Sequence, residues 1–291
     1  MDAQSYPLLS QLQVVSYIKA GFLALFTYDT LLQIQQEYLY IWKARWTLVK
    51  FLYLWTRYSP FIGATISVVH SSHPDFSKCN DMFTIVFGGF GIGITDLILI
   101  IRTYTLYERS KRLLVFFFFL FFSVGGVSFW AITKMTGSSH FRASNTETTG
   151  VASCYFTDAG TLGIGLVCYI SLLAGELVII LLTLWKMCRK FSQDSSGPGI
   201  LTSLYRDGIW FYLGILPFTI ATVIISFIAP PGLSDIASAP VAIMHSVLVC
   251  HLITHTRGMA AKEDQLAYDI KERAFRYGSD VVLDISPENK V

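Results

Sequence analysis

Four charged residues lie inside long apolar segments of the sequence, namely Asp29, Arg57, Asp96 and Glu176. Charged side chains in apolar surroundings are energetically costly, so they usually pair with one another or take part in function. If the segments are helices, a rise of 1.5 Å per residue places all four about 8 to 17 Å from one side of the molecule. We therefore expect them to share one layer.

This layer permits three kinds of chemistry. The first is a buried, neutral ion-pair network that fixes helix packing. The second is a polar switch that passes a helix shift from a ligand pocket to the opposite side of the molecule. The third is acid catalysis, in which Asp29, Asp96 or Glu176 is kept neutral by burial and donates a proton. The spacing leaves all three open, and the network candidates are Asp29, Lys50, Arg57, Asp96, Arg102 and Glu176.

The composition indicates which elements position these residues. The 291 residues are 53% hydrophobic and 14% charged, with a mean hydropathy of +0.52, whereas soluble domains carry about 25% charged residues. Seven apolar stretches are long enough, at about 20 residues each, to cross a bilayer as helices. We predict an all-α bundle of seven transmembrane helices at residues 14–34, 47–69, 82–104, 113–132, 160–184, 209–229 and 236–254.

The positions of lysine and arginine predict the orientation of this bundle. Fifteen of them fall in the segments after the first, third, fifth and seventh helices, whereas the opposite side holds only Lys78, Lys134 and Arg142. Because basic loops stay cytosolic, we expect the N-terminus outside and the C-terminus in the cytosol. Residues 1–256 form the membrane domain and 257–291 a cytosolic tail. The net charge of +2 indicates no nucleic-acid partner.

The tail beyond Gly258 has the pattern of a short amphipathic helix. Leu266, Ile270 and Ala274 share one stripe, and charged residues occupy the rest of the surface. We expect this helix to follow the seventh transmembrane helix and to lie along the inner leaflet.

Two cysteines fall on the predicted outer side. Cys79 precedes the third helix and Cys154 lies in the longest outer connection. Both would face an oxidising compartment, so we expect a disulfide between them, with two free outer thiols as the alternative.

The histidines predict no metal site. His251 and His255 have the i,i+4 spacing of paired ligands, but two ligands are too few for zinc. Helix seven contains no lysine that could hold retinal as a Schiff base. We therefore expect no cofactor.

A recognisable series of elements occupies the first two expected helices. It consists of Tyr28-Asp29-Thr30-Leu31-Leu32, Glu37, residues 42–50 and Arg57-Tyr58-Ser59-Pro60-Phe61. This series resembles the uncharacterised seven-transmembrane-helix family that is expanded in mushroom-forming basidiomycete fungi, with a family-defining segment at about residues 20–65. The run Ile101-Arg102-Thr103-Tyr104 is similar to the third helix of that family. The resemblance implies a multi-pass membrane protein and no particular activity.

The chain is also loosely similar to G-protein-coupled receptors. The shared features are the seven-helix topology, the placement of Cys79 and Cys154, the sequence Arg102-Thr103-Tyr104 and the amphipathic tail. However, Ile101 replaces the acidic residue that precedes the arginine in receptors, and helix seven lacks the Asn-Pro-x-x-Tyr motif. The similarity is therefore one of architecture.

These observations favour a receptor-like sensor of a small or lipidic ligand. The ligand would act through the intramembrane network on a cytosolic partner at the basic inner loops. The alternative is a membrane-embedded enzyme acting on a hydrophobic substrate, such as a terpene cyclase that uses an intramembrane carboxylic acid as proton donor. A transporter ranks last, because no inverted repeat is visible. The expected location is the plasma membrane or the endoplasmic reticulum, in contact with the lipid bilayer.

Overall fold

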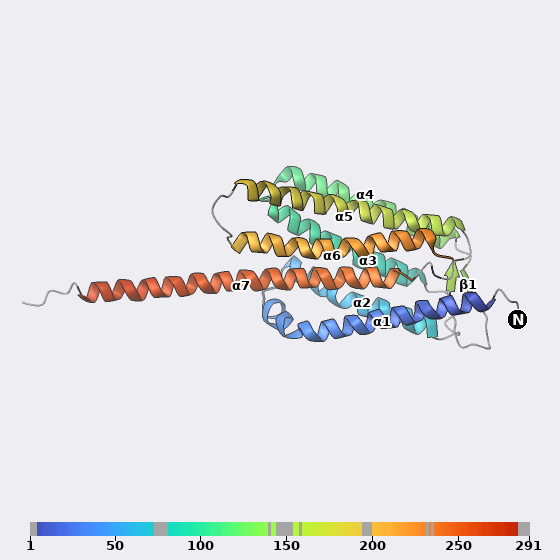
Figure 1. Ribbon diagram of the computed structural model, residues 1–291, viewed down its shortest axis with the longest axis horizontal. Coiled ribbons are helices and arrows are strands. Elements are labelled where there is room, and N and C mark those ends of the chain that lie inside the picture. Colours follow the sequence, from blue (N-terminus) through green and yellow to red (C-terminus); the bar gives the residue numbers. More distant parts are fainter. Residues whose placement is uncertain are drawn as a thin grey trace, which may run out of the picture.

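Each of the seven predicted apolar stretches forms an α-helix (Figure 1). The computed structural model describes residues 5–72, 81–138, 141–143, 154–156, 159–193, 200–230, 233 and 236–284. Most helices extend beyond the predicted limits, because polar residues at their ends continue the same backbone hydrogen bonding. Their bounds are α1 Ser5–Glu37, α2 Leu48–Ser72, α3 Asp81–Leu106, α4 Lys111–Ser138, α5 Ala159–Gln193, α6 Ile200–Ile228 and α7 Ser238–Asp284.

Within the residues that the structure describes, four of these helices contain a stretch that is long and apolar enough to cross a membrane. The stretches are Val86–Leu106, Lys111–Lys134, Gly163–Lys186 and Ser238–Arg276, and α6 contributes a shorter apolar stretch, Leu213–Ile228. In α4, Phe118, Phe119 and Phe122 lie exposed on the outside of the bundle, as expected for side chains that face lipid. The protein is therefore a membrane protein that contacts the lipid bilayer.

The helices run side by side in one bundle, with α3 and α7 at its centre (Figure 1). α3 contacts α2, α4, α5 and α7, whereas α7 contacts α1, α2, α3 and α6. Apolar side chains from most of these helices form the main core, which includes Tyr53, Ile98, Leu99, Phe117, Ile180, Ile215 and Leu252.

A one-turn π-helix, η1 (Tyr38–Trp42), continues α1 at the end of the bundle opposite the N-terminus. The Nζ of Lys50, a buried residue in α2, donates to the carbonyl oxygens of Trp42 at 2.9 Å and Ala44 at 2.8 Å. Lys50 therefore caps backbone carbonyls at the end of η1 that have no helical partner.

The connection between α4 and α5 contains an element that the all-α prediction did not include. Strands β1 (Phe141–Ala143) and β2 (Cys154–Phe156) pair antiparallel, with Phe141 opposite Phe156. They form a two-stranded ribbon near the N-terminal end of α1 (Figure 1).

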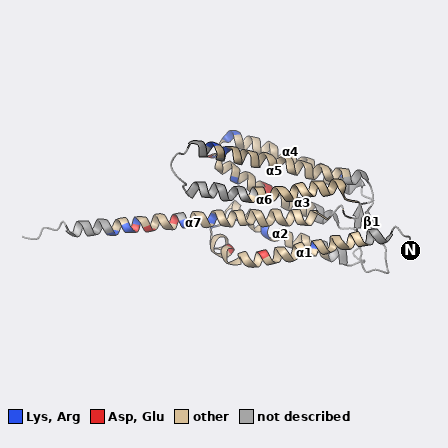
Figure 2. Ribbon diagram, in the orientation of Figure 1, with Lys and Arg blue, Asp and Glu red and all other residues tan. Residues whose placement is uncertain are grey.

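The sequence predicted a separate amphipathic helix in the tail. The structure instead shows the tail as a continuation of α7. α7 passes through Gly258 without a break and projects far beyond the other helices, carrying charges of both signs (Figure 2). The expectation was wrong because a single glycine costs a helix only about 1 kcal/mol, which Met259, Ala260 and Ala261 help to offset as helix formers. Gly258 instead allows close packing, since a Cβ atom there would lie 3.3 Å from the Tyr40 ring. Residues 259–284 form a helical rod about 39 Å long.

Candidate functional site

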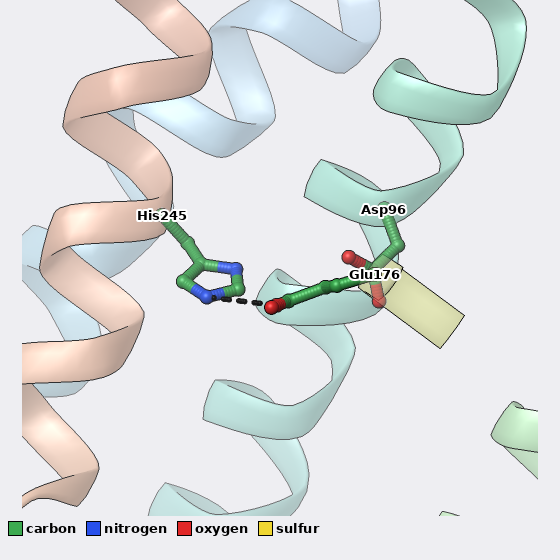
Figure 3. Close-up of side chains that lie close together, drawn as sticks. All are labelled: Asp96, Glu176 and His245. Atoms are coloured by element: carbon green, nitrogen blue, oxygen red, sulfur yellow. Dashed lines mark ion pairs between the residues drawn. The ribbon is translucent and has the colours of Figure 1, made fainter. Parts of the chain in front are cut away.

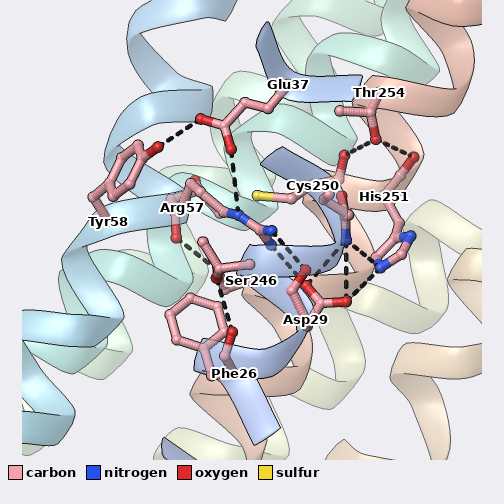
Figure 4. Close-up of polar contacts among 12 residues, drawn as sticks. Phe26, Asp29, Glu37, Arg57, Tyr58, Ser246, Cys250, His251 and Thr254 are labelled. Carbon is pink, nitrogen blue, oxygen red and sulfur yellow. Dashed lines mark hydrogen bonds and ion pairs between the residues drawn. The ribbon is translucent and has the colours of Figure 1, made fainter. Parts of the chain in front are cut away.

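Arg57 in α2 is the centre of the first buried polar cluster (Figure 4). Its side chain is 0% exposed, and its Nη1 lies 2.8 Å from Oδ2 of Asp29 in α1. Its Nη2 also donates to the backbone carbonyl of Asp29 at 3.3 Å, and its Nε lies 3.8 Å from Oε2 of Glu37. A planar guanidinium offers several donors in fixed directions, so one arginine contacts both carboxylates of α1.

Three polar residues of α1 face this arginine because they follow one another at every fourth position. Asp29, Gln33 and Glu37 therefore lie on one helical face. Nε2 of Gln33 donates to both carboxylate oxygens of Asp29, at 3.0 and 3.1 Å. The hydroxyl of Tyr58 donates to Oε1 of Glu37 at 2.7 Å, as does Nε1 of Trp42 at 3.1 Å. The π-helical turn places Trp42 five residues after Glu37, where its indole can reach back.

His251 brings α7 into the same cluster. Its Nε2 lies 2.8 Å from Oδ1 of Asp29 and also contacts the amide of Gln33. The histidine side chain is 40% exposed, whereas Asp29 is 18% exposed, so His251 is the member that reaches the bundle surface. Its ring also stacks on Phe211 of α6. We call Asp29, Gln33, Glu37, Arg57 and His251 the arginine cluster; it joins α1, α2 and α7.

A second buried cluster lies between α3, α5, α6 and α7 (Figure 3). Oε1 of Glu176 lies 3.1 Å from Nε2 of His245, and the hydroxyl of Thr219 lies 3.1 Å from the first atom and 3.2 Å from the second. Asp96 of α3 offers a carboxylate oxygen within 4.8 Å of both the glutamate and the histidine. We call Asp96, Glu176, Thr219 and His245 the carboxylate–histidine cluster.

The two clusters differ in how well their charges are compensated. In the arginine cluster both oxygens of Asp29 have hydrogen-bond partners. Arg57 Nε and Glu37 Oε2 form no hydrogen bond, but they lie 3.8 Å apart with opposite charges. In the carboxylate–histidine cluster, Oδ1 of Asp96 and Oε2 of Glu176 are buried without a hydrogen-bond partner. No lysine or arginine in the described part of the chain forms an ion pair with either carboxylate. This cluster therefore has the capacity to take up a proton or a cation.

The structure places the predicted network residues in different surroundings. It brings Asp29 to Arg57 and, separately, Asp96 to Glu176. Lys50 contacts backbone carbonyls and the Trp46 ring rather than a carboxylate. Arg102 belongs to neither of the two clusters as defined above. The single expected layer is thus two clusters with separate partners.

The structure does not describe the side chains of the predicted disulfide. Cys79 lies outside the described residues, as does the side chain of Cys154, so the pairing stays a prediction. The thiols of Cys168, Cys188 and Cys250 are free.

Cluster membership was not predicted for Gln33, Glu37, Thr219, His245 and His251. A signal for the first two was present, because a polar residue at every fourth position of an apolar helix marks a buried polar face. No comparable signal existed for His245, whose partners come from three other helices and lie 26 to 149 positions away in the sequence.

Comparison with known proteins adds one finding. Residues 17–62 match the model of a family of unknown function, DUF6533. No curated protein matches the sequence. The matched segment covers the second half of α1, all of η1 and the first part of α2, and so contains every member of the arginine cluster except His251. The part of the chain that is similar to this uncharacterised family is thus the part that surrounds Arg57.

Proposed function

We propose that this protein is a seven-span membrane sensor of receptor-like architecture, with its N-terminus outside and α7 as the element that carries its signal. One observation carries the proposal: a single uninterrupted helix supplies a histidine to each buried cluster and then forms the projecting rod. His245 and His251 lie six residues apart, or about 9 Å along the axis of α7. A displacement of α7 at either cluster would therefore move the rod.

In this proposal the arginine cluster favours one position of α7 relative to α1 and α2. It holds α1 and α2 together through the buried Arg57–Asp29 pair, and breaking such a pair by removing one partner costs about 3 to 5 kcal/mol. α7 joins the cluster through His251. A shift of α7 that separates His251 from Asp29 leaves the Arg57–Asp29 pair intact, so α7 can move at a smaller cost. The cluster thus favours one position of α7 without preventing a second.

The seven-span topology is supported by the arrangement of the helices and by their charges. All seven lie in one bundle, and each is at least 25 residues long, which exceeds the roughly 20 residues needed to cross a bilayer. The fifteen-to-three distribution of basic residues supports an external N-terminus. The match at residues 17–62 supports assignment to the fungal seven-helix family.

We propose that a small or lipidic ligand acts from the outer half of the bundle and that the rod and basic inner loops contact a cytosolic partner. The rod presents exposed Leu266, Tyr268, Ile270 and Phe275 among charged residues, a surface suited to a protein partner. The plasma membrane and the endoplasmic reticulum both fit this topology.

The packing favours the sensor over the terpene-cyclase alternative. The space beside Glu176, bounded by Leu99, Ile179, Ile180 and Ile215, is too narrow to admit a water molecule. A proton donor needs its substrate within hydrogen-bond reach. Asp96, the second carboxylic acid considered, lies in the same cluster as Glu176. Asp29, the third, already has both oxygens engaged.

The proposal is tested by measuring whether the arginine cluster controls the position of the rod. Spin labels are attached at Arg112, on the exposed start of α4, and at Ala274 on the rod, in the full chain in lipid nanodiscs with its native cysteines replaced. We expect Asp29→Asn and His251→Gln to shift or broaden the distance distribution. Tyr28→Phe, an exposed neighbour on α1, is the matched control and should leave it unchanged. Identical distributions in all four proteins would contradict the proposal.

A further inference from the structure

Three donor atoms of the carboxylate–histidine cluster form a nearly equilateral triangle. Its edges are 3.1 Å between Glu176 Oε1 and His245 Nε2, 3.1 Å between Glu176 Oε1 and Thr219 Oγ1, and 3.2 Å between Thr219 Oγ1 and His245 Nε2. A tetrahedral zinc ion with ligands at about 2.0 to 2.2 Å holds them roughly 3.3 to 3.6 Å apart. The triangle is therefore close in size to one face of a tetrahedral metal site.

Asp96 supplies the fourth corner. It lies on α3, and its carboxylate atom is within 4.8 Å of the ligand atoms of Glu176 and His245. One of its oxygens is buried without a hydrogen-bond partner, as is Oε2 of Glu176, whose side chain is 1% exposed. Figure 3 shows the two carboxylates close together, with the imidazole beside Glu176. To share one tetrahedral ion, the Asp96 oxygen would have to lie about 3.3 to 3.6 Å from the other donor atoms, compared with the present limit of 4.8 Å.

The charges of Asp96 and Glu176 are a second, independent argument for a bound cation. Two adjacent carboxylates at membrane depth repel each other, and within the described chain neither has a lysine or arginine as ion-pair partner. A divalent cation compensates both charges at once, while His245 and the Thr219 hydroxyl add neutral donors. The resulting complex has no net charge, which removes most of the cost of placing it in a bilayer.

We propose that Asp96, Glu176, Thr219 and His245 bind one divalent transition-metal ion of the zinc class. Imidazole and carboxylate ligands in a tetrahedral arrangement suit this class better than Mg²⁺ or Ca²⁺, which prefer six or more oxygen ligands. The ion would join α3, α5, α6 and α7 at one point. This inference does not depend on the proposed sensor function, because a structural metal would bind in the same way.

The test uses the full chain, purified with an affinity tag that contains no histidine, stripped with a chelator and placed in nanodiscs. Co²⁺ serves as the probe, because tetrahedral Co²⁺ has intense visible absorption. Bound metal is also counted by mass spectrometry after dialysis against ZnCl₂. We expect one ion per chain and a tetrahedral Co²⁺ spectrum.

Three variants locate the ion. Glu176→Gln and Asp96→Asn keep the side-chain shape and should each weaken Co²⁺ binding at least tenfold. His255→Gln, on an exposed position of the same helix, should bind like the wild type. Matching circular dichroism and elution volume show that each variant is folded. A wild-type protein that retains no metal would overturn the proposal, and so would unchanged binding by both carboxylate variants.

Discussion

Asp29→Asn removes the charge that faces a fully buried guanidinium. Arg57 is 0% exposed and loses a partner at 2.8 Å, and leaving a buried charge without its partner costs about 3 to 5 kcal/mol. Glu37 remains 3.8 Å from Nε of the same arginine, so part of the compensation survives. We therefore expect the low end of that range, about 3 kcal/mol, as the loss in free energy of unfolding.

Glu37, the neighbouring carboxylate, allows a second test of this prediction. Each of Asp29 and Glu37 partly compensates for loss of the other, so the single variants understate the importance of the pair. The double variant Asp29→Asn/Glu37→Gln leaves Arg57 without any carboxylate, and its loss should exceed the sum of the single losses by about 1 kcal/mol or more.

The free energies are measured by unfolding the protein with sodium dodecyl sulfate in mixed micelles, followed by circular dichroism. Tyr28→Phe, at an exposed neighbouring position, should stay within about 0.5 kcal/mol of the wild type. If Asp29→Asn falls within the same margin, the Asp29–Arg57 pair does not stabilise the bundle. If the double variant is merely additive, Asp29 and Glu37 do not compensate for each other's loss.

Three further predictions use the same unfolding measurement. Arg57→Lys should cost about 1 to 2 kcal/mol, because a lysine cannot reach Asp29 and Glu37 together as the planar guanidinium does; a loss as large as that of Arg57→Ala would mean that charge alone is insufficient. Phe117→Ala should cost about 2 kcal/mol more than Phe119→Ala, because Phe117 is 1% exposed and leaves a cavity, whereas Phe119 is 67% exposed and faces lipid; equal losses would place α4 in another rotation. Gly258→Val should lower the free energy of unfolding by about 1 to 3 kcal/mol through collision with the Tyr40 ring. Gly21→Val, where no neighbouring side chain lies within 4 Å of the added Cβ, should cause no such collision. A Gly258→Val variant as stable as the wild type would contradict the packing contact between α7 and η1.

The fold was predictable to the extent that it depends on local sequence. Runs of about 20 apolar residues require helices whatever their neighbours, because lipid leaves backbone groups no other partner. The end of α7 was not predictable in this way. Gly258 has the sequence signature of a helix stop, and only the position of Tyr40, 218 residues earlier, shows that it is a packing position instead.

The candidate site was predictable only in part, for a related reason. The cost of burying Asp29, Arg57, Asp96 and Glu176 identified them as residues that need partners. Their partners depend on how the helices rotate and which of them touch, information that hydrophobic periodicity does not carry. Lys50 illustrates this: its charge suggested a carboxylate partner, but the π-helical turn at the end of α1 placed free carbonyl oxygens within its reach.

α7 can carry a signal from the buried clusters only if it is one rigid helix from the membrane to the end of the rod. Spin labels at Ser238 and Ala274, in the full chain in nanodiscs, test this directly. A continuous helix separates the two positions by about 54 Å. A tail that turns at Gly258 to lie along the inner leaflet would bring them to about 38 Å. We predict a single narrow distribution near the longer distance, and a distribution centred on the shorter one would contradict the proposal that α7 carries a signal from the buried clusters to the rod.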